Sequence, residues 1–115
     1  MKILLVEDHD DTRCVLCRLL DRYGHGVTAA ANVAEARRLL HELQFDVLLS
    51  DIGLPDGNGF GLVVEAKRLQ PLTAVALTAW ASDDDKERGR TAGFDHYLTK
   101  PLDCARLRSV LAAAA

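Results

Sequence analysis

Polar side chains follow four short apolar runs of the sequence, at the point where each run ends. They are Glu7 and Asp8 after ILLV, Asp51 after VLLS, Thr78 after AVAL, and Lys100 after YLT. If the runs are parallel strands, their carboxyl ends meet at one edge of a sheet. Three carboxylates, a hydroxyl and an ammonium group then face one crevice.

The composition of this group indicates its chemistry. Three neighbouring carboxylates repel one another unless a cation joins them. Oxygen ligands without a nearby His or Cys pair suit a hard ion such as Mg²⁺, which takes only one or two carboxylates directly. A lysine and a hydroxyl are donors suited to phosphoryl oxygens. The group therefore predicts a magnesium and phosphoryl site, with one carboxylate free to act as a nucleophile.

The elements that must position these residues are five strands that alternate with five helices. The predicted strands cover residues 3–6, 27–30, 46–50, 74–77 and 96–98. The first, third and fourth are almost continuously apolar, as in parallel strands that helices cover on both faces. Five such units predict an α/β fold, an open and doubly wound parallel sheet.

Apolar residues at helical spacing, together with capping residues at helix starts, predict five helices. They cover residues 11–23, a segment that starts at Asn32 as N-cap, residues 58–69, a segment that starts at Ser82, and the residues after Asp103. The fourth helix has almost no apolar stripe. It also contains Gly89, which costs a helix about 1 kcal/mol relative to alanine.

Composition limits the possible classes of protein. The chain has 115 residues, of which 49% are apolar and 27% charged, and its formal net charge is -3. We expect residues 1–115 to form a single domain without an output domain. The mild acidity argues against nucleic-acid binding, and no apolar run indicates a membrane span or a signal peptide. Three cysteines cannot build a disulfide framework, which favours a reducing, cytoplasmic setting.

The motifs around the polar residues resemble the receiver domain of bacterial response regulators, which belong to two-component signalling. The resemblance rests on Glu7-Asp8, on SDIGLPDGNG with Asp51, on LTAW with Thr78, and on YLTKP with Lys100. It spans essentially the whole chain. It implies a flavodoxin-like fold with strand order 2-1-3-4-5 and five helices. The runs SDIGLPDGNG and GFDHYLTKP are most similar to receivers attached to hybrid histidine kinases.

The resemblance also implies a role for each residue of the group. Asp51 would be the phosphoacceptor, which takes a phosphoryl group from a phosphohistidine of a partner protein. Asp8 and Asp51 would bind Mg²⁺ directly, together with the backbone carbonyl of Gly53, and Glu7 would act through a metal-bound water. Lys100 would neutralise charge on the phosphoryl group.

Further implied features concern the response to phosphorylation. Thr78 would bond one phosphoryl oxygen and the backbone N–H of Ala79 another. Tyr97 would be the aromatic switch that turns inward when Thr78 moves. The Lys100-Pro101 peptide bond would be cis and would aim Lys100 into the site.

The implied partners are a histidine kinase or a histidine phosphotransfer protein. Such a partner would contact the first helix near Thr12 and Val15, and an exposed Val15 would support this docking face. The resemblance implies no direct contact with nucleic acid or a membrane. We expect a monomer or a weak dimer.

Two other functions stay open. A pseudo-receiver is a binding scaffold that takes no phosphoryl group, and it usually lacks the nucleophile or the lysine. A phosphatase with an aspartyl nucleophile, of the haloacid-dehalogenase kind, would carry a second acid where Gly53 stands. Gly53 and Trp80 also depart from the usual receiver residues beside the path of the hydrolytic water, so the rate of dephosphorylation stays open.

Two nearby features have simpler interpretations. Cys14 and Cys17 form a CxxC pattern, but the pair falls inside the first predicted helix, where a structural role is favoured over redox chemistry or zinc binding. His9 follows the acidic pair, and we expect a solvated loop residue.

Overall fold

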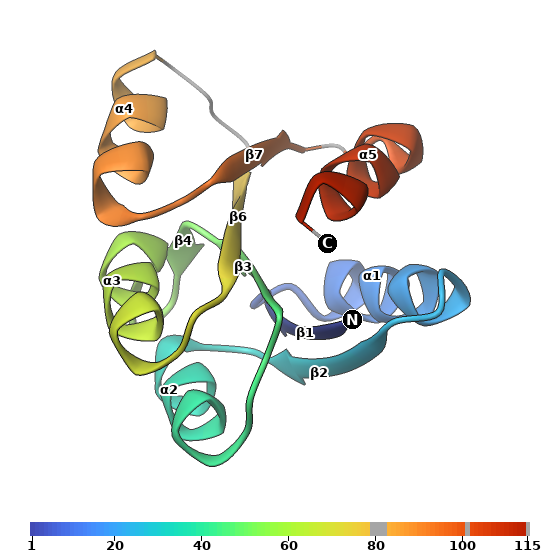
Figure 1. Cartoon of the computed structure of the whole chain (residues 1–115), viewed down its shortest axis with the longest axis horizontal. Helices are drawn as coiled ribbons and strands as arrows, with labels where there is room; N and C mark the ends of the chain where they lie inside the picture. Colours follow the sequence, from blue (N-terminus) through green and yellow to red (C-terminus); the bar gives the residue numbers. More distant parts are fainter. Residues whose placement is uncertain (79–82, 101, 115) are drawn as a thin grey trace.

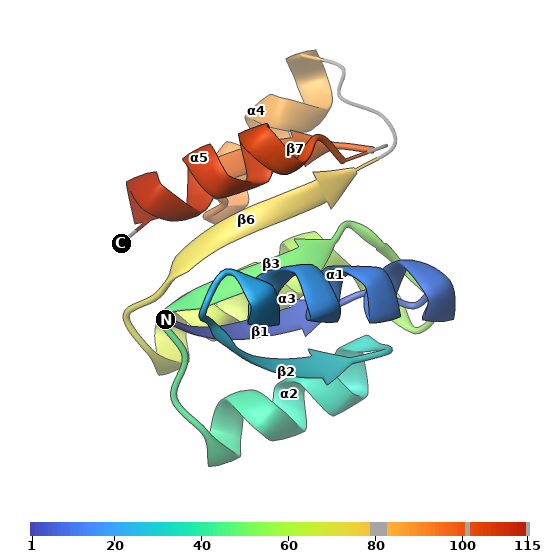
Figure 2. The ribbon, with the colours of Figure 1, turned by 90° about the vertical axis from the view of Figure 1, so that its right-hand side faces the viewer.

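A parallel sheet of five strands forms the centre of the molecule (Figures 1 and 2). The computed structural model describes residues 1–78, 83–100 and 102–114. The strands are β1 (Lys2–Val6), β2 (Gly26–Ala30), β3 (Val47–Asp51), β6 (Thr73–Thr78) and β7 (His96–Thr99). Their order is β2-β1-β3-β6-β7 and all neighbouring pairs are parallel. The predicted flavodoxin-like fold with strand order 2-1-3-4-5 is confirmed.

Helices cover both faces of this sheet. α1 (Asp10–Arg22) and α5 (Cys104–Ala114) lie on one face, and α2 (Val33–Glu42), α3 (Gly59–Leu69) and α4 (Asp83–Ala92) lie on the other (Figure 1). Among the described residues, no helix combines the length and the apolarity that crossing a bilayer requires.

The hydrophobic core is split by the sheet into two clusters. In β1, Ile3 and Leu5 belong to the cluster that contains residues of α1 and α5, whereas Leu4 and Val6 belong to the cluster that contains residues of α2 and α3. All four side chains are fully buried. Because both faces of the strand are covered, its sequence is a continuous apolar run and not an alternating one.

A short antiparallel hairpin follows β3, and the sequence did not predict it. Its strands, β4 (Gly53–Leu54) and β5 (Gly57–Asn58), are too short to show an alternating pattern. Asp56 in its turn accepts hydrogen bonds from the backbone N–H groups of Val33 (2.8 Å) and Ala34 (3.0 Å) at the start of α2. These bonds lower the pKa of Asp56 and tie the loop after Asp51 to α2.

Side-chain caps define where α2 and α3 begin. Asn32 caps α2, as predicted, and its Oδ1 accepts a hydrogen bond from the backbone N–H of Glu35 at 2.8 Å. Asn58 caps α3 in the same way, with the N–H of Gly61 at 3.0 Å. The predicted N-cap Ser82 lies outside the described residues.

Gln70 is a buried polar residue that joins the ends of α2 and α3. Its Oε1 accepts from the N–H of Phe45 at 2.8 Å, and its Nε2 donates to the carbonyls of Leu40 (2.9 Å) and Leu43 (2.8 Å). Replacing it with leucine leaves three backbone groups without this partner.

We expect Gln70→Leu to lower the free energy of unfolding by about 2 kcal/mol in urea denaturation. Gln44→Leu is the matched control, because Gln44 is exposed and close in sequence, and its effect is expected to stay within about 0.5 kcal/mol. Equal effects of the two substitutions would contradict a structural role for Gln70.

Candidate functional site

The carboxyl ends of four strands meet at one edge of the sheet. Val6 of β1 pairs with Ser50 of β3, Asp51 pairs with Leu77 of β6, and Thr78 pairs with Thr99 of β7. The polar residues that end or follow these strands are therefore neighbours in space, as the sequence predicted.

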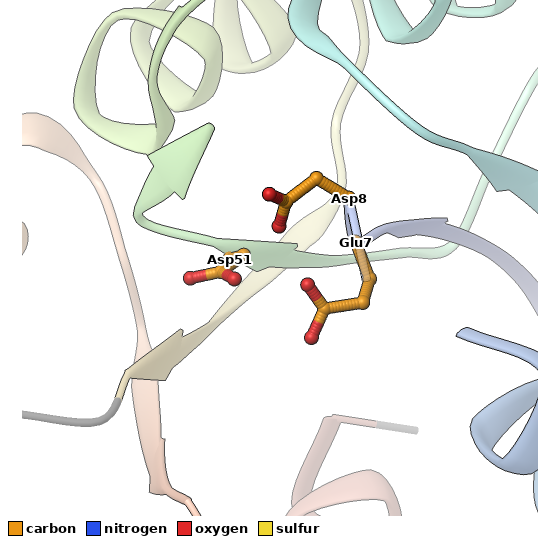
Figure 3. A group of neighbouring side chains, drawn as sticks. All are labelled: Glu7, Asp8 and Asp51. Carbon is orange, nitrogen blue, oxygen red and sulfur yellow. The ribbon is translucent and has the colours of Figure 1, made fainter. Parts of the chain in front are cut away.

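Glu7, Asp8 and Asp51 form an acidic cluster at this edge. Each supplies a carboxylate oxygen, and these oxygens lie within 4.8 Å of one another. Figure 3 shows the three carboxylates gathered around the same space. Glu7 is fully buried, Asp51 is partly buried and Asp8 is exposed. Three oxygen donors at this spacing fit a hard divalent cation such as Mg²⁺.

Lys100 connects the acidic cluster to β7. Its Nζ donates to Glu7 Oε1 at 2.5 Å and to Asp51 Oδ2 at 2.9 Å. Its backbone N–H donates to the carbonyl of Thr78 at 2.8 Å, which holds the ends of β6 and β7 together. One ammonium group thus contacts two of the three acids, and the third acid has solvent beside it.

The positive charge of Lys100 does not balance the negative charge of the acids in the cluster. Burial raises the pKa of Glu7 and the nearby Asp51 raises it further, while the hydrogen bond from Lys100 opposes the change. Burial alone would lower the pKa of Lys100, but its bonds to Glu7 and Asp51 raise it above its ordinary value. The lysine is thus well compensated and the glutamate is not, because Glu7 is more deeply buried and faces a second acid.

The remaining predicted site residues are placed as follows. Thr78 is buried at the end of β6. Tyr97 is half-buried in β7, and its hydroxyl donates to the carbonyl of Lys86 at 3.2 Å. The N–H of Gly53 donates to Asp51 Oδ1 at 3.3 Å, and a Cβ at Gly53 would meet no atom within 4 Å. The predictions for Ala79 and for the Lys100-Pro101 peptide bond fall on Ala79 and Pro101, outside the described residues.

Two residues beside the cluster have roles that the sequence did not predict. His9 is exposed, as expected, but it is also the N-cap of α1, and its Nδ1 accepts from the N–H of Thr12 at 3.4 Å. Arg13 donates to the carbonyl of Glu7 at 2.9 Å and pairs with Asp10. The spacing of three residues between Asp10 and Arg13 was the available signal.

The three cysteines are free thiols with no role in the proposed chemistry of the acidic cluster. Cys14 and Cys17 lie on α1 and Cys104 lies at the start of α5, and all three are free thiols. Burial raises the pKa of Cys17, so this thiol is less ionised than an ordinary one. A raised pKa is the opposite of what a redox CxxC pair needs, which agrees with the structural interpretation.

The raised pKa of Glu7 implies that the stability of the fold depends on pH. The folded protein holds a proton on Glu7 more tightly than the unfolded chain does, so ionising Glu7 as pH rises weakens the fold. With divalent cations chelated, we expect Glu7→Gln to be more stable than the wild type at pH 7. The difference should shrink toward about pH 3.5, where the carboxyl is protonated in both states.

Urea denaturation at the two pH values measures this difference. Asp21→Asn, at an exposed position of α1, is the control, and its effect is expected to stay within about 0.5 kcal/mol. A Glu7→Gln variant that is less stable than the wild type at pH 7 would show that the bond to Lys100 outweighs burial.

Comparisons with known proteins agree with this geometry. A model of the family described as "Response regulator receiver domain" matches residues 3–112. The response regulator protein PilR of Pseudomonas aeruginosa is 42% identical over 114 residues, which are 98% of this chain and 26% of PilR. The crystal structure of a two-component response regulator from Clostridium difficile has a TM-score of 0.95 at 26% identity, and covers 99% of this chain and 94% of that one.

The relatives differ in the kind of protein that contains the matched domain. The virulence sensor protein BvgS of Bordetella bronchiseptica is 34% identical over 126 residues, which cover 100% of this chain and 10% of BvgS. Because a response regulator and a sensor protein both match, the comparisons do not favour the predicted attachment to a hybrid histidine kinase. What they share is the matched domain itself, so this chain belongs to the response regulator receiver domain family.

Proposed function

We propose that this receiver takes a phosphoryl group onto Asp51 from a phosphohistidine of a histidine kinase or a histidine phosphotransfer protein. The observation that carries the proposal is the position of Asp51: its Oδ2 lies 2.9 Å from Lys100 Nζ, and its carboxylate is grouped with those of Glu7 and Asp8. Membership of the receiver family supports the same chemistry.

Of the two acids that Lys100 contacts, Asp51 is the better placed to be the nucleophile. Its side chain is 14% exposed, so an incoming phosphoryl group can approach it, whereas Glu7 is fully enclosed. In the transfer, an Asp51 oxygen forms a bond to phosphorus as the bond from phosphorus to the histidine nitrogen breaks, and the imidazole keeps the electron pair. Lys100 is within reach of the negative charge that develops on the phosphoryl oxygens.

Mg²⁺ is part of the proposed site. Asp8 and Asp51 would bind it directly with the carbonyl of Gly53, and Glu7 would act through water. The indirect role of Glu7 is supported by its burial and by its bond to Lys100. A bound Mg²⁺ would supply the positive charge that three acids and one lysine lack.

The proposed response involves β6 and β7. Thr78 and the N–H of Ala79 would bond phosphoryl oxygens, and Tyr97 would move with Thr78. Support comes from the burial of Thr78 at the end of β6 and from the bond that joins its carbonyl to the N–H of Lys100. The proposed cis Lys100-Pro101 bond follows β7 in the sequence and would aim Lys100 at Asp51.

A groove beside the acidic cluster supports the proposed docking face. It has a volume of 390 Å³ and reaches Lys100. α1 forms one wall, and Leu102 and Cys104 form the other. Thr12, Val15, Leu19 and Leu102 are among its lining residues. Val15 is 63% exposed, which is unusual for a valine and is the exposure expected of a docking face. We propose that the partner's histidine-bearing element lies in this groove.

The phosphoacceptor is tested with Mg²⁺ and acetyl phosphate, read by intact mass. We expect one phosphoryl adduct on the wild type, none on Asp51→Asn, and none when the Mg²⁺ is chelated. Asp46→Asn is the matched control, because Asp46 lies just before the opposite end of β3, and it should be labelled like the wild type. An adduct that survives Asp51→Asn would refute the proposal, and no adduct on the wild type would favour the pseudo-receiver.

The docking face is tested with Val15→Glu. We expect phosphotransfer from a phosphorylated histidine kinase to slow by about tenfold or more, since a charge is placed in an apolar contact. Labelling by acetyl phosphate should not change, because the substituted side chain lies outside the acidic cluster. Val64→Glu, on an exposed position of α3, is the control. Equal slowing by both variants would place the docking face elsewhere.

A further inference from the structure

Gly89 of α4 is a buried glycine that lies against the side chain of Tyr97. A Cβ built on Gly89 would overlap Oη of Tyr97 and would lie 2.5 Å from its Cζ. Both atoms are far inside van der Waals contact. With the tyrosine where it is, no other residue fits at position 89.

The space that Gly89 leaves is used by a hydrogen bond. The hydroxyl of Tyr97 donates to the carbonyl of Lys86 at 3.2 Å, three residues before Gly89 and on the adjacent turn of α4. The missing side chain therefore lets a strand residue bond directly to the backbone of the helix. Glycine weakens a helix interior relative to alanine, and this contact is a reason for its presence.

The backbone of α4 near Gly89 is held in place from its C-terminal side. The carbonyl of Gly89 accepts from the N–H groups of Gly93 (3.0 Å) and Phe94 (2.9 Å), which closes the end of the helix. Gly93 has a φ of 125°, a value that favours glycine. These bonds oppose a shift of the helix away from the sheet.

Aromatic packing holds the same region from the other side. The ring of Phe94 lies 6.1 Å from that of Tyr97 and 6.3 Å from that of Phe60 in α3. The guanidinium of Arg88 lies 5.0 Å from the centre of the Phe60 ring. Because α4 is fixed to α3 and to Phe94, a side chain at position 89 would displace the tyrosine ring sooner than the helix.

We propose that Gly89 is a positioning residue for Tyr97: it admits the tyrosine hydroxyl to α4 and so sets where the ring lies. The geometric part of this inference is independent of phosphorylation. Its regulatory part rests on the proposed function, in which Tyr97 responds to the state of Asp51. Gly89 then controls how firmly the tyrosine is held in the position bonded to Lys86.

The first test is a double-variant cycle on stability. In an ordinary helix, replacing glycine with alanine increases the folding equilibrium constant about fivefold. We expect that gain for Gly61→Ala, because Gly61 is exposed in α3 and a Cβ there would meet only Asn58 Oδ1, at 3.9 Å. For Gly89→Ala we expect a loss when Tyr97 is present and a gain in a Tyr97→Ala background.

These outcomes decide the inference even if Gly89→Ala does not fold. In that case the Gly89→Ala/Tyr97→Ala protein should fold, because the obstacle to the Cβ has been removed. A fivefold gain at position 89 with Tyr97 in place would overturn the proposal. So would a double variant that stays unfolded while Tyr97→Ala alone folds.

The second test observes the tyrosine directly. The chain contains two tyrosines, so NMR with labelled tyrosine resolves the ring signals of Tyr97 and uses those of Tyr23 as an internal reference. We expect Gly89→Ala to shift the ring signals of Tyr97 and leave those of Tyr23, and Gly61→Ala to leave both. Unchanged Tyr97 signals in a folded Gly89→Ala protein would overturn the inference.

The same samples separate this inference from the proposed function. Mg²⁺ and acetyl phosphate are added, and labelling is read by intact mass. If Asp51 takes no phosphoryl group, the proposed function fails but the stability cycle and the Tyr97 signals still report on Gly89. If Asp51 is labelled, we expect Gly89→Ala to reduce the further shift that phosphorylation causes in the Tyr97 signals. An undiminished shift would overturn the regulatory part.

Discussion

The contact between the Lys100 ammonium and the carboxylates of Glu7 and Asp51 is the interaction on which this structure depends. The fold gathers three acids at one edge of a sheet, and burying one of them without compensation is costly. Lys100 compensates two of them, at 2.5 Å and 2.9 Å, and so allows Glu7 to lie fully enclosed. One cation cannot balance three acids, and the raised pKa of Glu7 reflects this deficit. A divalent cation such as Mg²⁺ fits this deficit of positive charge.

The sheet and its loops keep the acids from moving apart. β1 and β3 are neighbours in the centre of the sheet, with both faces covered, so the strand ends that carry Glu7 and Asp51 cannot separate without exposing core residues. Arg13 holds the loop after β1 through the carbonyl of Glu7, and Asp56 holds the loop after β3 through the start of α2. The repulsion between the acids is therefore contained by bonds outside the cluster.

The sequence predicted what depends on patterns along the chain and missed what depends on contacts across it. Buried parallel strands leave continuous apolar runs, so the sheet and the residues at its carboxyl edge could be predicted. The β4–β5 hairpin has only two residues in each strand and leaves no such pattern. The bond from the N–H of Val33 to the carboxylate of Asp56 joins residues 23 positions apart, and nothing in either local sequence indicates the other. Gly89 was interpreted as a cost to α4, because the tyrosine hydroxyl that needs its space comes from β7.

β7 is the element through which the acidic cluster and α4 can affect each other. It is four residues long, and in the described part of the chain it pairs with β6 alone. The residue after its end, Lys100, bonds to Asp51, and Tyr97 near its start bonds to the backbone of α4. Only Leu98 and Thr99 separate Tyr97 from Lys100 along the chain. In the proposed function, a change in the position of Lys100 would therefore reach Tyr97 and its contact with Gly89. α4 has few apolar residues with which to hold the sheet, so it depends on contacts such as the Tyr97 bond and the packing of Arg88 on Phe60.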